Sequence, residues 1–405
     1  MKPEICISGI DKQAFIDYAM SVIVQHVRIT ENQHDSLEQK FNAITSLLDN
    51  SELESFRPVL RPQGSMRLGT AIRSANKPND FDVDIVVELL NLPQNWTPKN
   101  LKEAVGRVLK NSDRYVDLII PPEGGKRCWT IVYADGTHVD LLPSAITENY
   151  YRSIGMDEFS NFNDFELRIT DKTRVWEYNN ETDRTKWPIT NPIGFAEWFF
   201  MQARINDAKH KMNESRQIRA TVEQFPKWNK SNFILQDIVC LLKRHRDIEF
   251  GEDKDKPISM IITVLAAKAY RLAGNGGIYS TLIDIANNLV NMMEIRNGNR
   301  VVLNPVHPLE DFTDRWRRND GNKKEENFYS WVKKLQQDLS KLTALNRVEL
   351  GKSLKEMFGD FAVEKAWEEI SRKEMEENKS LKMTSSGIFS NQGIITPKPN
   401  TFYGL

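Results

Sequence analysis

Cysteine is scarce in this chain, and long hydrophobic runs are absent. Its 405 residues include only three cysteines, Cys6, Cys128 and Cys240, which are odd in number and far apart. That pattern argues against a disulfide framework and against a clustered zinc site. No run approaches the roughly 18 apolar residues that cross a membrane, and the segment from Met1 to Ile10 lacks a basic-then-apolar signal pattern. The sequence therefore predicts a cytoplasmic protein without a membrane partner.

An excess of charge of one sign is also absent. The 55 Lys and Arg residues nearly balance the 56 Asp and Glu residues, which leaves a net charge of −1. This balance gives no general attraction to DNA or RNA, so it disfavours a constitutive nucleic-acid partner. The six histidines are scattered without paired spacing, which disfavours a histidine-based metal site. A hydrophobic content of 40% with 27% charged residues is typical of a soluble globular protein.

The stretch from Gln63 to Leu90 has residue choices that suit phosphate chemistry better than packing. Gly64 and Ser65 follow a short β-prone run and precede a possible turn of helix. A glycine lets the backbone approach a phosphate closely, and free N–H groups at a helix start favour an anion there. Gly-Ser is also ordinary turn composition, so this feature alone is weak evidence.

Two aspartates lie in the next predicted strand. Residues 81–87 have the length and β-branched content of a strand buried in a sheet. Because side chains alternate along a strand, Asp82 and Asp84 point to the same side. Two neighbouring carboxylates are costly unless a cation lies between them, and hard oxygen ligands suit Mg²⁺ or Mn²⁺. The alternative for an isolated Asp-x-Asp is an edge strand with a solvated polar face.

A third carboxylate favours the metal interpretation. The alternation of residues 137–142 places Asp140 on a predicted neighbouring strand. Three carboxylates beside a Gly-Ser turn describe a site for two metal ions, one activating an attacking hydroxyl and the other steadying a triphosphate. We therefore predict Asp82, Asp84 and Asp140 as catalytic residues and metal ligands. Asp140 is also placed to accept the proton of the attacking hydroxyl.

These residues together resemble a known family. Gly64-Ser65, Asp82-x-Asp84 and the distant Asp140 resemble the DNA polymerase β-type nucleotidyltransferase superfamily. The segments QGSMRLGTAIR and DVDIVVEL are similar to sequences of its cGAS/DncV-like branch (CD-NTases). These proteins are bacterial relatives of cyclic GMP-AMP synthase and oligoadenylate synthase. The similarity continues in LLKRHRD and PISMII, and it extends to about residue 273. An inserted loop at residues 74–80 explains why the spacer between the Gly-Ser pair and the first aspartate is longer than is usual for the superfamily.

The resemblance implies an α+β fold. In that fold, a polymerase β-like nucleotidyltransferase core with a mixed sheet is joined by a long N-terminal spine helix to a C-terminal helical bundle like that of oligoadenylate synthase. We expect residues 1–190 to hold the N-terminal helices and the catalytic core, 191–371 the helical domain, and 372–405 a flexible tail. In some relatives' operons a ubiquitin-transfer-like machinery conjugates the C-terminus, so the tail is a candidate for a conjugation or regulatory partner; a frayed end without a role is the alternative.

The resemblance also implies which residues hold the nucleotide. Lys243 and Ser259 are expected to contact the triphosphate, together with the Gln63-Gly64-Ser65 turn. The alternative for Lys243, Arg244 and Arg246 is a solvated basic face of a helix. We interpret His245, on the apolar side of the same helix, as a packed histidine rather than a base.

The function implied by the resemblance is template-independent nucleotidyl transfer. A ribose hydroxyl attacks the α-phosphate of a nucleoside triphosphate in line, and pyrophosphate leaves. The expected product is a cyclic di- or trinucleotide second messenger for antiphage (CBASS-type) defence. We expect the enzyme to be a monomer that uses two Mg²⁺ ions, which Mn²⁺ can replace. Its expected substrates are nucleoside triphosphates that include ATP. One alternative keeps this chemistry but transfers the nucleotide to an RNA end, a protein or a small molecule; neutral charge counts against RNA. Another is a non-enzymatic nucleotide-binding scaffold, which the intact carboxylates disfavour.

Periodicity and capping residues predict the individual elements. Thr30 and Thr97 are expected N-caps, and Pro98 is suited to a first helical turn. The remaining pattern predicts helices at residues 11–24, 30–50, 194–208, 231–249, 259–272, 279–293 and 327–345, and strands at residues 114–120 and 127–133. Because period-two alternation nearly disappears after residue 190, we expect the second half to be helical throughout.

Overall fold

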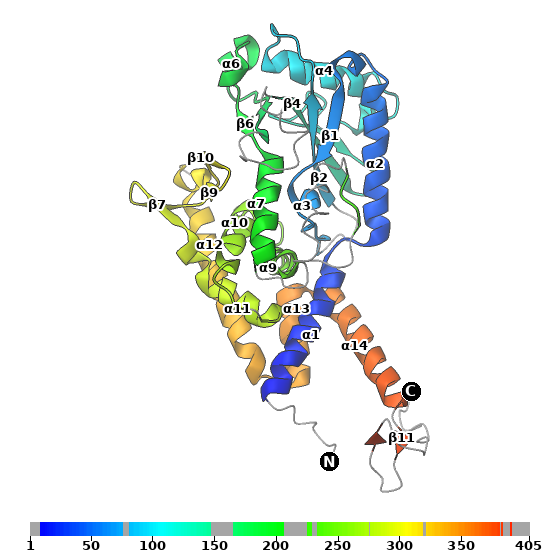
Figure 1. Ribbon diagram of the computed structural model, residues 1–405, viewed down its shortest axis with the longest axis vertical. Coiled ribbons are helices and arrows are strands. Elements are labelled where there is room, and N and C mark those ends of the chain that lie inside the picture. The colour runs from blue at the N-terminus through cyan, green and yellow to red at the C-terminus, as the bar shows by residue number, and fades with distance from the viewer. Residues whose placement is uncertain are drawn as a thin grey trace.

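The computed structural model describes residues 9–75, 81–146, 165–205, 225–228, 233–274, 276–318, 321–380, 382–383 and 389–390. The described part of the chain forms two lobes with separate hydrophobic cores. Figure 1 shows a sheet with α2 and α4 at one end of the molecule, and α1 with most of the later helices at the other. The α+β class predicted from the sequence is confirmed.

The first lobe is built on a mixed sheet of strand order β1-β2-β4-β5-β6, with β3 also paired to β4. Strands β2 and β4 are parallel, and the other pairs are antiparallel. The strands are β1 (Pro58–Pro62), β2 (Phe81–Leu89), β3 (Trp129–Val132), β4 (Thr137–Ile146), β5 (Leu167–Ile169) and β6 (Ile189–Thr190). Helices α2 (Glu31–Asp49) and α4 (Pro98–Lys110) contact each other and the sheet.

The alternation of β2 determines which of its side chains face these helices. Val83 and Ile85 are buried in one core with Leu37 and Phe41 of α2 and Leu101 of α4. Because neighbouring strand residues point to opposite faces, Asp82 and Asp84 point away from this core. Burial of the apolar face therefore determines where the two carboxylates point.

Both predicted helix starts of this lobe are confirmed. The side chains of Thr30 and Thr97 each accept a hydrogen bond from a backbone N–H three residues later, and Gln33 and Asn100 complete the capping boxes. Pro98 occupies the first turn of α4, where a missing N–H costs nothing.

The second lobe is mainly helical. Its core gathers residues from eight helices, which are α1 (Gly9–Val27), α7 (Pro192–Ile205), α9 (Ile234–Phe250), α10 (Ser259–Tyr270), α11 (Ile278–Asn288), α12 (Asn322–Lys341), α13 (Arg347–Phe358) and α14 (Asp360–Ser380). Short elements connect these parts: α3 (Gly64–Arg67), α6 (Val175–Asn180), and the 3₁₀ turns η1 (Glu54–Phe56), η2 (Val116–Leu118), η4 (Arg184–Lys186), η6 (Val290–Met292), η7 (Asp314–Arg317) and η8 (Leu342–Ala344).

Two separate helices precede the sheet, as the sequence predicted. Helix α1 ends at Val27, α2 begins at Glu31 after the N-cap Thr30, and Arg28 forms an isolated bridge with Ile72 between them. Core residues of α1, such as Ile16 and Met20, lie in the core of the second lobe, although we expected the segment to accompany the catalytic core. The capping preference of Thr30 explains the break, because an N-cap residue takes extended rather than helical backbone angles.

Two further expectations differ from the structure. Residues 114–120 contain a 3₁₀ turn rather than a strand, and only Ile119 forms an isolated bridge, to Ile131. The second lobe includes short paired strands, which are β7 (Glu294–Arg296), β8 (Asn299–Val301), β9 (Leu303–Asn304) and β10 (His307–Asp311). Asn297 and Gly298, both with positive φ, form the β7–β8 turn, and this Asn-Gly pair is a hairpin signal that periodicity alone overlooked.

The last long helix continues past residue 371, where we expected the helical domain to end. Helix α14 extends to Ser380 and packs against α1. Beyond it, β11 (Lys382–Met383) pairs with β12 (Phe389–Ser390), and the rest of the predicted tail lies outside the described residues. In the described part of the chain, no helix is both long and apolar enough to cross a membrane.

Candidate active site

Two of the predicted carboxylates lie side by side. In the parallel pairing of β2 with β4, Asp84 is in register with Asp140, and Asp82 is in register with His138. Thr130 of β3 is opposite Asp140, and its hydroxyl donates a hydrogen bond to Asp140 Oδ1. The Asp82 side chain is 87% exposed, with its Oδ1 3.6 Å from His138 Nδ1. The sheet thus brings all three aspartates to one place, as the sequence predicted.

The electrostatics of this group favour a bound cation. Burial, together with the negative charges of Asp140 and Asp82, raises the pKa of Asp84 to about 6, and the positive charge of Lys243 opposes the increase. A carboxyl group that is buried beside two others is costly to ionise. A divalent cation would supply the missing positive charge, and three carboxylates are the hard oxygen ligands that such cations prefer. The residues therefore fit a divalent metal ion.

The Gly-Ser turn lies directly against Asp84. The Gln63 N–H donates a 2.8 Å hydrogen bond to the Asp84 carbonyl, and α3 begins at Gly64. Gly64 has φ +57°, and a Cβ at this position would lie 2.8 Å from Asp84 Oδ2. Both the backbone angle and the close approach require glycine here.

The turn and the carboxylates line one cleft of about 730 Å³ between the lobes. Most of the predicted site residues line it, namely Gly64, Ser65, Asp82, Asp84, Lys243 and Ser259. Gln63 and Asp140 adjoin this group through Asp84, the first by its hydrogen bond and the second by strand register. The cleft therefore combines acidic groups from the sheet with basic and hydroxyl groups from the helical lobe.

The basic residues of α9 are buried rather than solvated. Lys243 donates a 2.8 Å hydrogen bond to the carbonyl of Thr70, and burial lowers the pKa of its ammonium group. Arg244 donates to the carbonyl of Arg73 at 2.7 Å. The alternative of a solvated basic face is therefore wrong, because each of these cations is more than 90% buried.

Arg246 is a cleft residue to which the sequence assigned no role. Its Nη1 donates to the Pro257 carbonyl at 2.6 Å and to the Ser259 hydroxyl at 3.2 Å, and its Nε donates to Asp247 at 2.7 Å. Arg246 thus holds Ser259 at the start of α10. Arg246 follows Lys243 by three residues, so both lie on one side of a helix. This spacing could have indicated from the sequence that Arg246 faces the same cleft as Lys243.

His245 is a packed histidine, as expected. Its Nδ1 accepts a hydrogen bond from Trp331 Nε1 at 3.1 Å, so the proton is on Nε2, which donates to Asp338 Oδ2 at 3.2 Å. Both histidine nitrogens are thus engaged inside the helical lobe and cannot serve as a base in the cleft.

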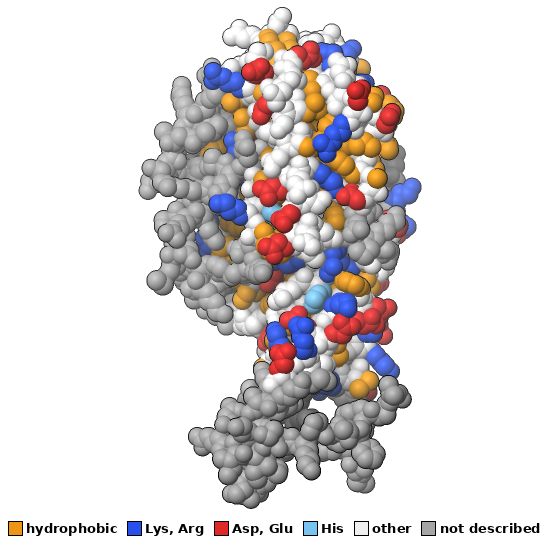
Figure 2. Space-filling model, turned by 90° about the vertical axis from the view of Figure 1, so that its right-hand side faces the viewer, with side chains coloured by type: hydrophobic (Ala, Val, Ile, Leu, Met, Phe, Trp, Pro, Cys, Tyr) orange, Lys and Arg blue, Asp and Glu red, His pale blue; other side chains and the backbone are white. Residues whose placement is uncertain are grey.

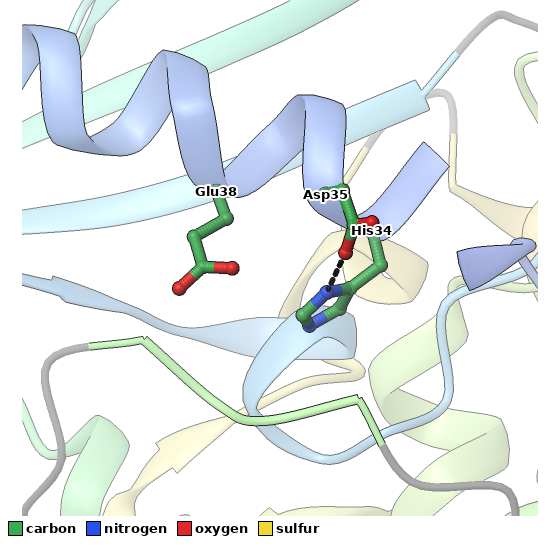
Figure 3. Close-up of side chains that lie close together, drawn as sticks. All are labelled: His34, Asp35 and Glu38. Carbon is green, nitrogen blue, oxygen red and sulfur yellow. Dashed lines mark ion pairs between the residues drawn. The ribbon is translucent and has the colours of Figure 1, made fainter. Parts of the chain in front are cut away.

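Another group with potential metal ligands lies on α2. His34, Asp35 and Glu38 have ligand atoms within 4.8 Å of one another (Figure 3), and they are the one such His, Cys, Asp and Glu group among the described residues. His34 Nε2 is 2.8 Å from the carbonyl of Pro226, and the two carboxylates are exposed. None of the three lines the cleft, so this group is separate from the predicted metal ligands.

Among the described residues on the face that includes α2, no broad basic region is present. Figure 2 shows acidic and basic side chains interspersed over the described part of this face. This distribution matches the near-zero net charge and differs from the basic stripe that nucleic-acid binding requires.

Comparisons with known proteins agree with this geometry. Residues 58–143 match the model of a protein family, the nucleotidyltransferase domain of proteins like the cyclic GMP-AMP synthase DncV. A c-di-GMP synthase of Roseivirga ehrenbergii is 27% identical, with 96% of this chain and 97% of that protein covered. The cyclic dinucleotide synthase CdnG of Bradyrhizobium diazoefficiens is 22% identical, with 74% of this chain and 70% of that protein covered.

Solved structures share the fold over both lobes. The structure of Bradyrhizobium diazoefficiens CdnG in complex with GTP has a TM-score of 0.63 at 19% identity and covers 88% of this chain and 99% of its own. Escherichia coli MS115-1 CdnC has a TM-score of 0.56 at 13% identity, with 85% and 97% covered. The matched domain includes the Gly64-Ser65 turn and all three aspartates. As the resemblance in the sequence predicted, residues 58–143 match the DncV-like nucleotidyltransferase domain, and the chain is similar over most of its length to cyclic dinucleotide synthases.

Proposed function

We propose that this nucleotidyltransferase condenses nucleoside triphosphates, GTP among them, into a cyclic dinucleotide. The observation that carries the proposal is the alignment of Asp84 with Asp140, with Gly64 and Ser65 against Asp84 in the same cleft. Two similar proteins indicate which substrate and which product to expect. The one that matches almost the whole chain is a c-di-GMP synthase, and the similar CdnG structure contains GTP.

In this proposal, Asp82, Asp84 and Asp140 hold two Mg²⁺ ions, which Mn²⁺ can replace. When bound, such ions polarise the α-phosphate and lower the pKa of the attacking ribose hydroxyl. Asp140 would accept the proton of that hydroxyl. Thr130 orients Asp140 through the hydroxyl hydrogen bond to Oδ1.

In this proposal the triphosphate is held by groups from both lobes. Gly64 lets the backbone approach the phosphates, and Ser65 supplies a hydroxyl donor. Lys243 contributes positive charge near Asp84, and Ser259 contributes a second hydroxyl that Arg246 orients. Positive charge and donors placed at the triphosphate stabilise the negative charge that develops on pyrophosphate as it leaves.

The product class suggests a biological role. A cyclic dinucleotide has no free phosphate ends and is suited to act as a diffusible second messenger. By its family membership, this protein would supply that messenger for antiphage (CBASS-type) defence. GTP and ATP are the substrates to test first.

The test is product analysis with purified protein. We would incubate it with single ribonucleoside triphosphates and with all pairs, in Mg²⁺ or Mn²⁺, then treat with phosphatase and identify products by mass spectrometry. The expected result is a phosphatase-resistant cyclic dinucleotide that contains guanosine. Products that appear only when RNA, protein or a small-molecule acceptor is added would contradict the proposal. The Asp82→Ala variant should yield no product.

A further inference from the structure

The segment after the Gly-Ser turn is held by side chains from outside the first lobe. The carbonyl of Leu68 accepts a 2.8 Å hydrogen bond from Gln236, and the carbonyl of Gly69 accepts one from Arg28. As described above, the next contacts are Lys243 with Thr70 and Arg244 with Arg73. We call these four contacts the carbonyl clamp; three of its donors lie on α9, and Arg28 lies between α1 and α2.

Gln236 is fixed at both ends of its amide group. Its Oε1 accepts a 2.9 Å hydrogen bond from the Phe233 N–H at the start of α9, so its Nε2 must be the atom that donates to Leu68. The side chain is only 6% exposed. A buried amide with both atoms bonded has one orientation available, so it determines where the Leu68 carbonyl lies.

The backbone at Gly69 is shaped for this contact. Gly69 has φ +63°, and a Cβ there would lie 2.5 Å from Gln236 Nε2. Only glycine leaves room for the amide to reach past it. Arg28, which donates to the Gly69 carbonyl, is itself held by a 2.5 Å ion pair with Asp237 of α9. Both donors are therefore attached to the same helix.

The other side of the clamped segment is bonded to the turn. The Leu68 N–H donates to the Gly64 carbonyl at 3.1 Å, and the Thr70 N–H donates to the Ser65 carbonyl at 2.9 Å. Residues 68–70 therefore have N–H groups bonded to the turn and carbonyl groups bonded to the clamp. A shift of α9 relative to the sheet would be transmitted to Ser65 through these few bonds.

We propose that Gln236, together with Arg28, is a positioning residue that fixes the Gly64-Ser65 turn opposite Asp84 for triphosphate binding. The proposal rests on the proposed function, because it takes the turn to be a phosphate-binding element. Gln236 itself does not line the cleft, so it acts through the Leu68 carbonyl. Helix α9 would thereby couple the position of the helical lobe to the binding of substrate.

The chain offers a matched control. Gln336 of α12 donates from its Nε2 to the Ala286 carbonyl of α11 at 3.0 Å, which is the same type of contact between two helices of the helical lobe. Gln236→Met and Gln336→Met each remove one side-chain to carbonyl hydrogen bond while keeping a similar side-chain volume. Gln236→Met also removes the acceptor of the Phe233 N–H. Comparing them separates the effect on the turn from a general loss of stability.

The experiment measures hydrogen exchange of backbone amides in residues 64–73, and the affinity for a non-hydrolysable GTP analogue, in both variants. Loss of one buried hydrogen bond predicts about tenfold faster exchange and about tenfold weaker binding in Gln236→Met. We expect neither change in Gln336→Met, and a lower melting temperature in Gln236→Met, because only that variant also loses the bond from the Phe233 N–H. If Gln236→Met fails to fold, Arg28→Lys should give the same pattern. It retains the charge facing Asp237 but lacks the planar guanidinium group, whose second nitrogen donates to the Gly69 carbonyl.

Unchanged exchange of residues 64–73 in Gln236→Met would overturn the clamp. Faster exchange with unchanged affinity would also overturn the positioning role, because the turn would then be loosened without consequence for the substrate. A wild-type protein that binds no triphosphate and forms no product would instead contradict the proposed function. The exchange measurement needs no substrate, so the two failures are distinguishable.

Discussion

The two lobes hold their charged site residues in different ways. In the sheet, Asp84 and Asp140 are brought together by strand register, and the packing of Val83 and Ile85 against the helices determines which way the carboxylates point. On α9, Lys243 and Arg244 are buried and bonded to backbone carbonyls about 170 residues earlier in the chain. Local alternation thus positions the acidic groups, whereas long-range contacts position the basic ones.

The largest effect should come from breaking the acidic side. Asp84→Asn keeps the shape of the side chain but removes the charge that a divalent cation needs, so we expect turnover to fall by at least about 10³-fold. Product formation from GTP measures this loss. A variant with near-normal turnover would exclude Asp84 as a metal ligand.

The approach of the turn to Asp84 can be tested with Gly64→Ala. A Cβ would meet Asp84 Oδ2 in a left-handed backbone conformation, so the turn must shift. A displacement of about 1 Å predicts about a 10²-fold loss of kcat/KM. Gly298→Ala is the control, because Gly298 also has positive φ (+78°) but its Cβ would meet nothing within 4 Å. Equal losses in both variants would show that the backbone angle, rather than the contact with Asp84, matters.

A buried network in the helical lobe should affect stability and leave the chemistry unchanged. Burial raises the pKa of Asp338, but hydrogen bonds from His245, Lys334 and Lys341 outweigh it and hold the pKa well below its usual range. Asp338→Asn should therefore lower the free energy of unfolding by about 2 kcal/mol. Chemical denaturation measures this change.

The control for that prediction is Asp314→Asn, which breaks an exposed pair with Arg318 and should cost less than about 1 kcal/mol. The KM for GTP should stay at the wild-type value in both variants. A raised KM in Asp338→Asn would show that the two lobes are coupled through this network.

The smallest effect is a dependence of metal-induced stabilisation on pH. The pKa of Asp84 is raised to about 6 in the folded chain. The protonated carboxyl therefore makes its full contribution to the free energy of unfolding below about pH 4, and this contribution is lost as the pH rises through about 6. A divalent cation binds the ionised form. Added Mg²⁺ should therefore raise the melting temperature more at pH 8 than at pH 5.

Asp84→Asn serves as the control for this measurement, since it should remove the difference between the two pH values. Equal stabilisation by Mg²⁺ at pH 5 and pH 8 in the wild-type protein would show that the cation binds elsewhere.

The sequence predicted the acidic side of the site better than the basic side. Asp82 and Asp84 could be placed because period-two alternation is a local property, and Thr30 and Thr97 because capping depends on neighbouring residues. The role of Arg246 could not be predicted, because its partners on α10 depend on how two helices pack.

The same distinction explains the errors in the fold. The place of α1 in the core of the helical lobe depends on packing between distant segments. Residues 114–120 alternate in sequence, yet the backbone turns there and only Ile119 bridges to β3. In contrast, the β7–β8 hairpin had a local signal in Asn297-Gly298 and could have been predicted.

The central claim is that the two lobes meet at a metal-dependent triphosphate site. The most direct test is a crystal structure with Mn²⁺ and a non-hydrolysable GTP analogue, with manganese located by its anomalous scattering. The account predicts manganese bound by Asp84 and its two neighbouring aspartates, with the triphosphate against Gly64 and Ser65. Manganese at the His34 group of α2, with none between the aspartates, would contradict it.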